Sequence, residues 1–407
     1  MKAAAERVRV LALGSGITVL GVLRTLSKSH ADVVALPDVD RVTRRSRWFR
    51  AAPRALSGMK ADTLGLCLES LLVPTVLMPC SDLWVRAVAA LPADVRIRYP
   101  ASVAPLQVLD LLVDKARFGS TLDRLGLPHP ATHLLGSVQD LGFVSDTILQ
   151  SSFLKPVHSQ QFFARFGVKA FLIADRSNAE ERLAECIDAG LQMMLQEYVP
   201  GPPTNHYFVD GFIDRFGVVR ALFARRRLRM SPPDFGNSTL MISVPISETG
   251  NAVATLKTLF ADIDYRGIFS AEFKRDPRDG VFKLIEVNAR PWWYVEFAAR
   301  CGVNVCELAI RDALDEPVET ISEYVVGRRC VFPYYDLPAV RAERSAGRLG
   351  FVGWARSWFG AYQPIFRWSD PLPALSEVSI LIARRLSEVS ILIARRLGRL
   401  GGTRRPR

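Results

Sequence analysis

Two glutamates and one asparagine form the most informative set of side chains in this sequence. They lie in residues 267–290, which read GIFSAEFKRDPRDGVFKLIEVNAR, at Glu272, Glu286 and Asn288. Two carboxylates and an amide oxygen are hard ligands, which suit Mg²⁺ held jointly with phosphate oxygens. A purely structural role explains them less well, because two uncompensated carboxylates on one face would repel each other. The segment therefore predicts metal-dependent phosphate chemistry.

The pairing of two strands decides whether these groups meet. Runs rich in β-forming residues flank DPRDG, which predicts an antiparallel hairpin. With a five-residue DPRDG loop, Arg275 pairs with Val281. Glu272 then lies opposite Leu284, and Glu286 lies diagonally across on the same face. A two-residue DG loop would separate the glutamates, but the proline of DPRDG fits poorly inside a strand.

Basic side chains that suit phosphate occur earlier in the chain. Lys155 ends an apolar run, where a lysine without a role would be costly. Residues 223–241, FARRRLRMSPPDFGNSTLM, carry four arginines, and we expect three of them to lie on a strand that faces a cleft: Arg226, Arg227 and Arg229. We expect Arg226 to grip a γ-phosphate or a substrate carboxylate, with a solvated basic edge strand as the alternative. His206 and Asp210 are weaker candidates, and we expect His206 to be structural.

The chain opens with a pattern typical of a parallel sheet. Val8–Leu13 is a short apolar run, GSG follows, and a helical pattern leads to a second apolar run at Asp32–Leu36. Gly14 and Gly16 fit the first two positions of a dinucleotide fingerprint, but Val19 takes the third. These glycines therefore either permit a tight turn only or contact a substrate or phosphate.

Later elements follow from hydrophobic spacing and turn residues. Helical spacing from Leu106 to Leu125 is interrupted at Asp114-Lys115 and ends at GLPHP. After that point the patterns predict helices over 179–190 and 251–262, and strands over 153–156, 168–173, 193–198, 207–212 and 218–223.

Composition excludes several classes of protein. Of the 407 residues, 49% are apolar and 23% are charged, which is ordinary for a globular chain. Six cysteines without a CxxC pair, and five histidines without ligand spacing, argue against a zinc site and for thiols in a reducing compartment. GxSxG, HExxH and GxxxxGK[ST] are absent, so serine hydrolase, zinc protease and P-loop readings lack their residues. The broken apolar start and the lack of a membrane-length apolar run predict a cytoplasmic protein.

The net charge of +12 is concentrated near the C-terminus. Residues 321–407 hold 15 arginines against six acidic residues, so the rest is close to neutral and no nucleic-acid partner is expected. Residues 375–385, LSEVSILIARR, recur unchanged at 386–396, and an 11-residue period stacks identical side chains on one helical face. This helix is a surface or packing helix, a basic amphipathic helix on an anionic membrane, or a partner-binding helix.

The motifs, and their order along the chain, resemble those of the ATP-grasp superfamily. ExN followed by Arg, with another Glu fourteen residues earlier, resembles its metal-binding signature. Asp114-Lys115 resembles the lysine on the opening helix, FLKP at 153–156 the strand lysine, and LQEYVPG at 195–201 the hinge strand. The RxLR…PPDFG pattern is similar to that of predicted ATP-dependent carboxylate–amine ligases. The resemblance covers residues 1–320.

The resemblance implies a role for each matching residue. Lys115 and Lys155 would neutralise phosphate charge, and Arg290 would stabilise the transferring phosphoryl group or an acyl phosphate. The hinge residues would contact the nucleotide base and ribose through two side chains, Gln196 and Glu197, and the backbone near Tyr198 and Val199. The expected cofactors are ATP and Mg²⁺, or Mn²⁺ in its place, and the metal ligands are Glu272, Glu286 and Asn288.

One loop departs from the superfamily pattern. Many relatives close a glycine-rich loop over the phosphates, whereas VHSQQFFARFG here contains only Gly167. Either side chains such as His158, Ser159 or Gln160 replace some backbone contacts, or the loop closes differently.

Together these expectations describe an α/β protein of three parts. Residues 1–110 would form a Rossmann-like parallel-sheet domain, residues 111–320 an ATP-grasp domain with antiparallel sheets, and residues 321–407 a basic extension with a duplicated amphipathic helix. The resemblance implies a ligase that joins a small carboxylate, an amino acid or related acid, to an amine through an acyl phosphate, releasing ADP and phosphate. The alternatives are an ATP-grasp enzyme of another class, carboxylase-like or phosphotransfer, or a non-catalytic nucleotide-binding module at the inner membrane surface, held there by residues 375–396. The residues name neither substrate nor the oligomeric state.

Overall fold

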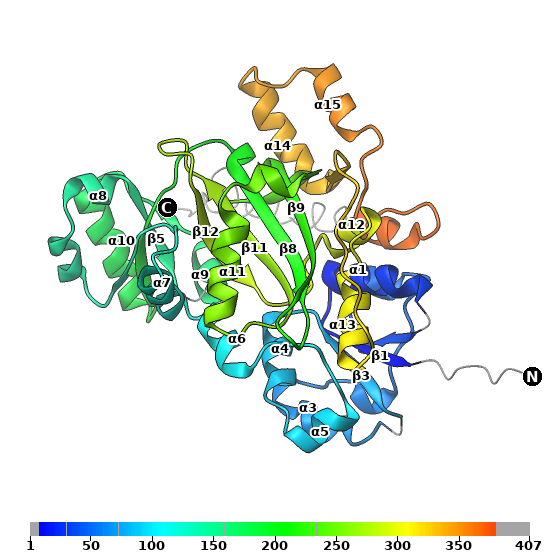
Figure 1. Ribbon diagram of the computed structural model, residues 1–407. Coiled ribbons are helices and arrows are strands. Elements are labelled where there is room, and N and C mark those ends of the chain that lie inside the picture. Colours follow the sequence, from blue (N-terminus) through cyan, green and yellow to red (C-terminus); the bar gives the residue numbers. More distant parts are fainter. Residues whose placement is uncertain (1–7, 30, 72, 158, 233–234, 380–407) are drawn as a thin grey trace, which may run out of the picture.

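The computed structural model describes residues 8–29, 31–71, 73–157, 159–232 and 235–379 (Figure 1). They form three sheets, one parallel and two antiparallel, as expected of the α/β class. Short 3₁₀ turns interrupt the connections at Leu26–Lys28, Arg54–Leu56, Ala61–Thr63, Val138–Phe143, Pro203–Asn205 and Ile246–Thr249. Most of the duplicated tail helix, residues 380–396, lies outside the described residues.

A three-stranded parallel sheet forms the N-terminal unit, with strand order β2-β1-β3. Strands β1 and β3 are short apolar runs whose side chains are largely buried, which is typical of strands covered on both faces. Its strands are β1 (Arg9–Leu13), β2 (Asp32–Ala35) and β3 (Thr75–Pro79), and its helices are α1 (Ile17–Thr25), α2 (Arg41–Arg44), α3 (Leu64–Leu68), α4 (Asp82–Ala89) and α5 (Ala93–Arg98).

The glycine turn after β1 is filled by a carboxylate of the chain itself. Gly16, at φ 79°, donates its N–H to Asp40 Oδ2 at 2.7 Å, and Asp40 accepts further hydrogen bonds from Ser15 and Thr43. These hydrogen bonds outweigh burial and lower the pKa of Asp40. Since Asp40 occupies the amide at this helix start, the structure favours the tight-turn reading of the glycines over a phosphate contact.

A four-stranded antiparallel sheet forms a second lobe, at the left of Figure 1, with strand order β4-β7-β5-β6. Helices α6 (Leu106–Val113) and α7 (Lys115–Arg124) lead into it and break at Asp114, whose carboxylate accepts the N–H groups of Ala116 and Arg117. The lobe contains β4 (Thr132–Leu135), α8 (Asp146–Gln150), β5 (Ser152–Pro156), α9 (Ser159–Phe166), β6 (Phe171–Leu172), α10 (Arg176–Asp188) and β7 (Met193–Glu197).

The central sheet is antiparallel, with strand order β12-β11-β8-β9-β10-β13. Side chains alternate along its strands. Tyr207, Val209 and Ala271 enter an apolar core on the face covered by α11, whereas their neighbours along the strands, such as Phe208 and Glu272, point to the opposite face. The elements of this part are β8 (His206–Ile213), β9 (Val219–Ser231), β10 (Asn237–Val244), α11 (Ala252–Asp262), β11 (Gly267–Arg275), β12 (Phe282–Asn288), α12 (Val295–Arg300) and α13 (Val305–Ala313).

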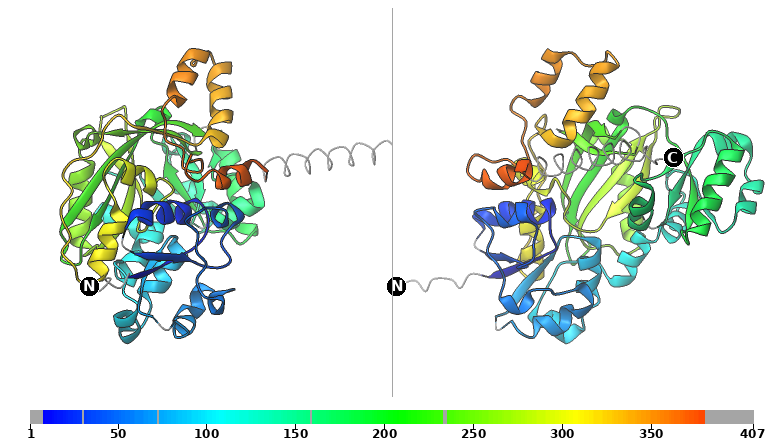
Figure 2. Two further views of the ribbon diagram at one scale, coloured as in Figure 1. Left: turned by 90° about the vertical axis from the view of Figure 1, so that its right-hand side faces the viewer. Right: turned by 180° about the vertical axis from the view of Figure 1, so that it is seen from behind.

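Part of the basic extension belongs to this central sheet. Strand β13 (Arg329–Val331) pairs with β10, and α14 (Pro333–Ser345) and α15 (Phe351–Trp358) project beyond the sheet in both views of Figure 2. The buried carboxylate of Asp336 on α14 accepts hydrogen bonds from Arg229, Thr239 and Trp358. This network holds the two helices against β9 and β10. Domain boundaries at residues 110 and 320 stay predictions.

Candidate active site

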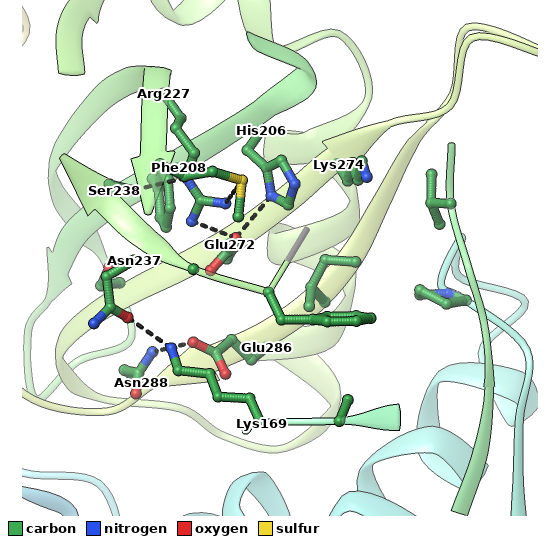
Figure 3. Close-up of a pocket in the computed structure, with 18 of the residues that line it drawn as sticks. Lys169, His206, Phe208, Arg227, Asn237, Ser238, Glu272, Lys274, Glu286 and Asn288 are labelled. Carbon is green, nitrogen blue, oxygen red and sulfur yellow. Dashed lines mark hydrogen bonds and ion pairs between the residues drawn. The ribbon is translucent and has the colours of Figure 1, made fainter. Parts of the chain in front are cut away.

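A cleft of about 730 Å³ lies between the central sheet and the second lobe (Figure 3). Strands β5 and β7 supply one wall, and β8, β9, β11 and β12 supply the other. Nine of the eleven residues predicted for the site line it: Lys155, Gln196, Glu197, Tyr198, Val199, Glu272, Glu286, Asn288 and Arg290. Lys115 lines an adjoining pocket of about 490 Å³, and Arg226 lines neither.

Glu272 lies directly opposite Glu286 in the β11–β12 hairpin. The predicted register was wrong: Arg275 pairs with Phe282 instead of Val281, a shift that by itself would put Glu286 on the other face. A β-bulge lies between the Phe273–Leu284 pair and the Glu272–Glu286 pair, and the additional residue in β12, Ile285, returns Glu286 to the face of Glu272. The hairpin was predicted correctly, but the placement of its two glutamates opposite one another depends on the bulge.

Glu272 is held by two basic side chains. Its Oε1 lies 2.8 Å from Nδ1 of His206 and accepts a hydrogen bond from Nη2 of Arg227 at 2.9 Å. Burial pushes the pKa of Glu272 upward, but the charge of Arg227 and the hydrogen bond with His206 outweigh it and hold the pKa well below its usual range. Burial and Arg227 lower the pKa of His206 to about 4, so its imidazole is neutral near pH 7. His206, expected to be structural, thus lies in the cleft beside a proposed metal ligand.

Asn288 and Arg290 continue this cluster toward the N-terminal unit. Asn288 donates from Nδ2 to Glu286 Oε1 at 3.1 Å, and its Oδ1 accepts from Arg290 Nη2 at 3.1 Å. Arg290 also donates to both oxygens of Asp82, at 2.9 and 3.0 Å. Asp82 begins α4, so a bidentate ion pair joins the N-terminal unit to the cleft.

The oxygen ligands in the cleft fit a divalent cation that shares its coordination with phosphate. Glu272, Glu286 and Asn288 lie on one face and could supply two carboxylates and an amide oxygen, the kind of ligand that Mg²⁺ prefers. Within the described part of the chain, no group of three or more His, Cys, Asp or Glu side chains is placed to hold a metal. The remaining ligands would therefore have to come from a bound phosphate and water.

Two lysines approach the cleft from the second lobe and its leading helix. Lys115 Nζ donates to the carbonyl oxygens of Pro156 and Val157 at 2.7 and 2.9 Å. Burial and the neighbouring Lys155 lower the pKa of Lys115 to about 8. Lys155 Nζ donates to Gln196 Oε1 at 3.4 Å. The two ammonium groups are close enough to influence one another, and an anionic ligand between them would relieve that repulsion.

The hinge residues are placed at the cleft but are partly engaged. Burial raises the pKa of Glu197, yet hydrogen bonds from Lys283, Arg278 and the N–H of Ala131 outweigh it and lower the pKa below its usual range. The N–H of Tyr198 donates to Ser151 at 2.7 Å, so this amide does not face a ligand. The expected contact between a nucleotide base and the backbone near Tyr198 and Val199 therefore stays a prediction, and it would have to use other backbone groups of this segment. The ring of Tyr198 packs near Phe153 and Phe235, which supply an apolar surface for a planar base.

Arg226, the arginine expected to bind a phosphate or carboxylate in the cleft, does not line it. Arg226 points to the opposite face of β9, where its Nε donates to the carbonyl of Thr204 at 2.6 Å and its guanidinium covers the ring of Tyr207. Arg225 and Arg227 line the cleft, because side chains on a strand alternate between faces. Arg225 is neutralised by the buried carboxylate of Asp210, which also accepts a hydrogen bond from Ser270. The two-residue spacing of Arg225, Arg227 and Arg229 was the signal that would have selected this face.

Lys169 and Lys274 line the cleft although no motif pointed to them. Lys169 lies between α9 and β6, just after the segment that departs from the glycine-rich pattern, and that segment forms α9 instead of a loop. His158 and the side chains of Ser159 and Gln160, proposed to replace backbone contacts, lie outside what the structure describes.

Comparisons with known proteins agree with this arrangement. No protein-family model matches the chain. A D-aspartate ligase from Enterococcus faecium (strain Aus0004) is 22% identical over 245 residues, which are 58% of this chain and 58% of that ligase. The match therefore spans little more than half the length of that relative.

Several solved structures share the fold at low sequence identity. An N5-carboxyaminoimidazole synthetase from Staphylococcus aureus has a TM-score of 0.61 at 15% identity and covers 83% of this chain and 86% of its own. The biotin carboxylase domain of the Hydrogenobacter thermophilus 2-oxoglutarate carboxylase has a TM-score of 0.61 at 16% identity, over 79% of this chain and 73% of that one. An L-amino acid ligase from Bacillus licheniformis has a TM-score of 0.56 at 17% identity, over 79% and 78%.

A parallel-sheet unit followed by two antiparallel sheets around a charged cleft defines the class: the chain has the ATP-grasp fold. Two of the proteins that it resembles at low identity, the D-aspartate ligase and the L-amino acid ligase, are amino acid ligases by name. No helix among the described residues has the length and apolar character needed to cross a membrane.

Proposed function

We propose that this chain is a ligase that spends ATP on joining a small carboxylate, an amino acid or a related acid, to an amine. The observation that carries the proposal is the direct pairing of Glu272 with Glu286 beside Asn288, inside a cleft lined by lysines and arginines. Paired carboxylates among cationic side chains suit a polyphosphate that arrives with a divalent cation. The names of two relatives, a D-aspartate ligase and an L-amino acid ligase, support the class of reaction.

The proposed reaction has two steps. A carboxylate oxygen of the acid attacks the γ-phosphorus in line, the bond to the β–γ bridging oxygen breaks, and ADP leaves. The nitrogen of the amine then attacks the acyl carbon, phosphate leaves with the electrons of the C–O bond, and the nitrogen loses a proton. Both steps depend chiefly on positioning and on neutralising the charge of phosphate oxygens.

The residues of the cleft divide this work by position. Lys155 and Lys115 approach from the second lobe and would neutralise phosphate charge, while Phe153, Tyr198 and Phe235 would contact the base. Arg290 stands beside Asn288 at the junction with the N-terminal unit, where its planar fork would bind the acyl phosphate or the acid.

Glu272, Glu286 and Asn288 would hold Mg²⁺, or Mn²⁺ in its place. When bound, the cation would lower the charge on the transferring phosphoryl group. The protein's own part is to keep Glu272 ionised: Arg227 and His206 hold this carboxylate in its charged form, ready to bind a cation.

The test is ADP release from the full chain with Mg²⁺-ATP across pairs drawn from a panel of amino acids, small acids and amines, D-aspartate included. We expect turnover only with a matching acid and amine, and an amide product detected by mass. Glu286→Gln serves as the inactive control.

Two results would contradict the proposal. ADP release that requires bicarbonate and no amine would assign the chain to carboxylase-like chemistry. ATP binding without turnover on any pair, together with binding to anionic vesicles that is lost when residues 375–396 are deleted, would assign it to a non-catalytic module at a membrane.

A further inference from the structure

Lys169 reaches across the cleft from a loop of the second lobe. It lies between α9 and β6, and its Nζ donates to Oδ1 of Asn237, at the start of β10, at 2.8 Å. In Figure 3 its side chain points into the pocket toward Asn237, in the neighbourhood of Glu286 and Asn288. One ammonium group of the second lobe therefore contacts the central sheet beside the paired carboxylates.

The charges around Lys169 match a site for phosphate. Burial lowers the pKa of Lys169, whereas the negative charges of Glu272 and Glu286 act to raise it. These carboxylates partly compensate its charge while no ligand is bound. A polyphosphate with its cation would bring both charges into the same region, so the ammonium would exchange a carboxylate environment for phosphate oxygens.

The segment that precedes Lys169 lacks the usual means of holding phosphate. Residues 157–167 contain a single glycine and form helix α9 over Ser159–Phe166, so few of their amides can approach a ligand closely. A long cationic side chain needs no such approach, because a lysine ammonium can reach a phosphate as a point charge from several ångströms away.

We propose that Lys169 binds the terminal phosphate of the nucleotide, in place of the amides of a glycine-rich loop, and that Asn237 positions its ammonium across the cleft. This inference rests on the proposed function, since it presupposes a nucleotide between the two sheets. One side chain would then both neutralise the γ-phosphate and join the second lobe to the central sheet.

Binding of two nucleotides that differ only at the γ-phosphate tests the inference. The full chain and its variants would be titrated calorimetrically, with Mg²⁺ present, using ADP and the β,γ-imido analogue of ATP. We expect Lys169→Met to weaken binding of the imido analogue about tenfold or more, which is the size of a lost charged hydrogen bond. ADP affinity should change by less than about twofold, because ADP lacks the phosphate that Lys169 would contact.

Three further variants keep the result interpretable. Lys169→Arg should retain most of the affinity for the imido analogue, since the charge remains. Lys257→Met removes a lysine on α11, outside the cleft, and should change neither affinity. Asn237→Ala should weaken the imido analogue by less than Lys169→Met does, because it removes only the group that positions the ammonium. Unchanged thermal midpoints would show that all of the variants are folded.

The possible failures can be told apart. If Lys169→Met weakens both nucleotides equally, or Asn237→Ala reproduces its full effect, Lys169 merely tethers the two lobes and the inference is wrong. If Lys169→Met has no effect while the wild-type chain prefers the imido analogue, the inference is also wrong. If the wild-type chain binds neither nucleotide, the proposed function itself fails.

Discussion

Glu286 faces Glu272 across the β11–β12 hairpin because one additional residue, Ile285, is accommodated in a bulge of β12. On the side of the bulge nearer the turn, Phe273 pairs with Leu284, and both side chains enter the apolar core. On its other side the two glutamates pair, and both line the cleft. A bulge re-aims the side chains that follow it, and here it creates the pair of carboxylates on which the proposed chemistry depends.

Removing one carboxylate should abolish turnover without unfolding the chain. Glu286 is exposed, so Glu286→Gln keeps the shape of the side chain and removes only its charge. We expect ADP release to fall by about 10²–10³-fold, the usual effect of losing a group that stabilises transition-state charge. Excess Mn²⁺ should restore part of the rate. Full activity in this variant would show that Glu286 is not a metal ligand.

Two neighbouring arginines on β9 should differ sharply in effect. Arg227 lines the cleft and binds Glu272, whereas Arg226 lies on the other face against Tyr207. We expect Arg227→Met to lower kcat/KM for ATP by at least about tenfold, since Glu272 then loses a charged partner. Arg226→Met should change kcat/KM by less than about threefold, because Arg226 is partly exposed and away from the site. Equal effects of the two substitutions would contradict the alternation of faces along β9.

Nucleotide binding should weaken as the pH rises above 8. Burial and Lys155 lower the pKa of Lys115 from its ordinary value of 10.5 to about 8 in the protein without ligand. Its positive charge is therefore complete near pH 6.5 and is lost as the pH rises through 8. Binding phosphate favours the charged form, so the Kd for ATP should increase, by up to about tenfold per pH unit, between pH 8 and the higher pKa of the complex.

Lys115→Arg is the matched variant for this pH dependence. Arginine stays charged throughout this range, so the Kd of the variant should stay nearly constant from pH 7 to 9.5. The measurement is calorimetric titration in buffers of equal ionic strength. A wild-type Kd that does not change over this range would show that Lys115 does not contact the phosphates.

The buried ion pair under α14 should matter for stability. Asp336 is fully buried and accepts hydrogen bonds from Arg229, whose side chain is 10% exposed. Asp336→Ala would leave the arginine without its partner, and we expect the free energy of unfolding to drop by about 3–5 kcal/mol. The double variant Arg229→Met with Asp336→Leu should recover most of the loss, because no buried charge remains. Urea denaturation followed by fluorescence measures both effects, and a loss below about 1 kcal/mol in the single variant would contradict them.

Local pattern was sufficient for much of the fold. The apolar runs of β1 and β2, the break between α6 and α7 at Asp114 and the hairpin around DPRDG were all predicted and are present. These features depend on hydrophobic spacing and turn chemistry over a few residues, so neighbours in sequence are enough to define them. The order of lysine, hinge and hairpin motifs also predicted the ATP-grasp fold, which the structure neighbours share.

Contacts between distant segments could not be predicted in this way. The ion pair between Arg290 and Asp82 joins residues that are 208 positions apart in the sequence. The hydrogen bond from Lys169 to Asn237 joins residues that are 68 positions apart. The face presented by Arg226 and the register of Glu286 each depend on a shift of one residue. Side chains on a strand alternate between faces, so a shift of one residue moves a side chain to the opposite side of the sheet. Residue types and their spacing were therefore enough to predict the fold and to propose a kind of chemistry. Which side chains meet was decided by strand register and by packing between lobes, because those are set by the whole chain and not by any one segment of it.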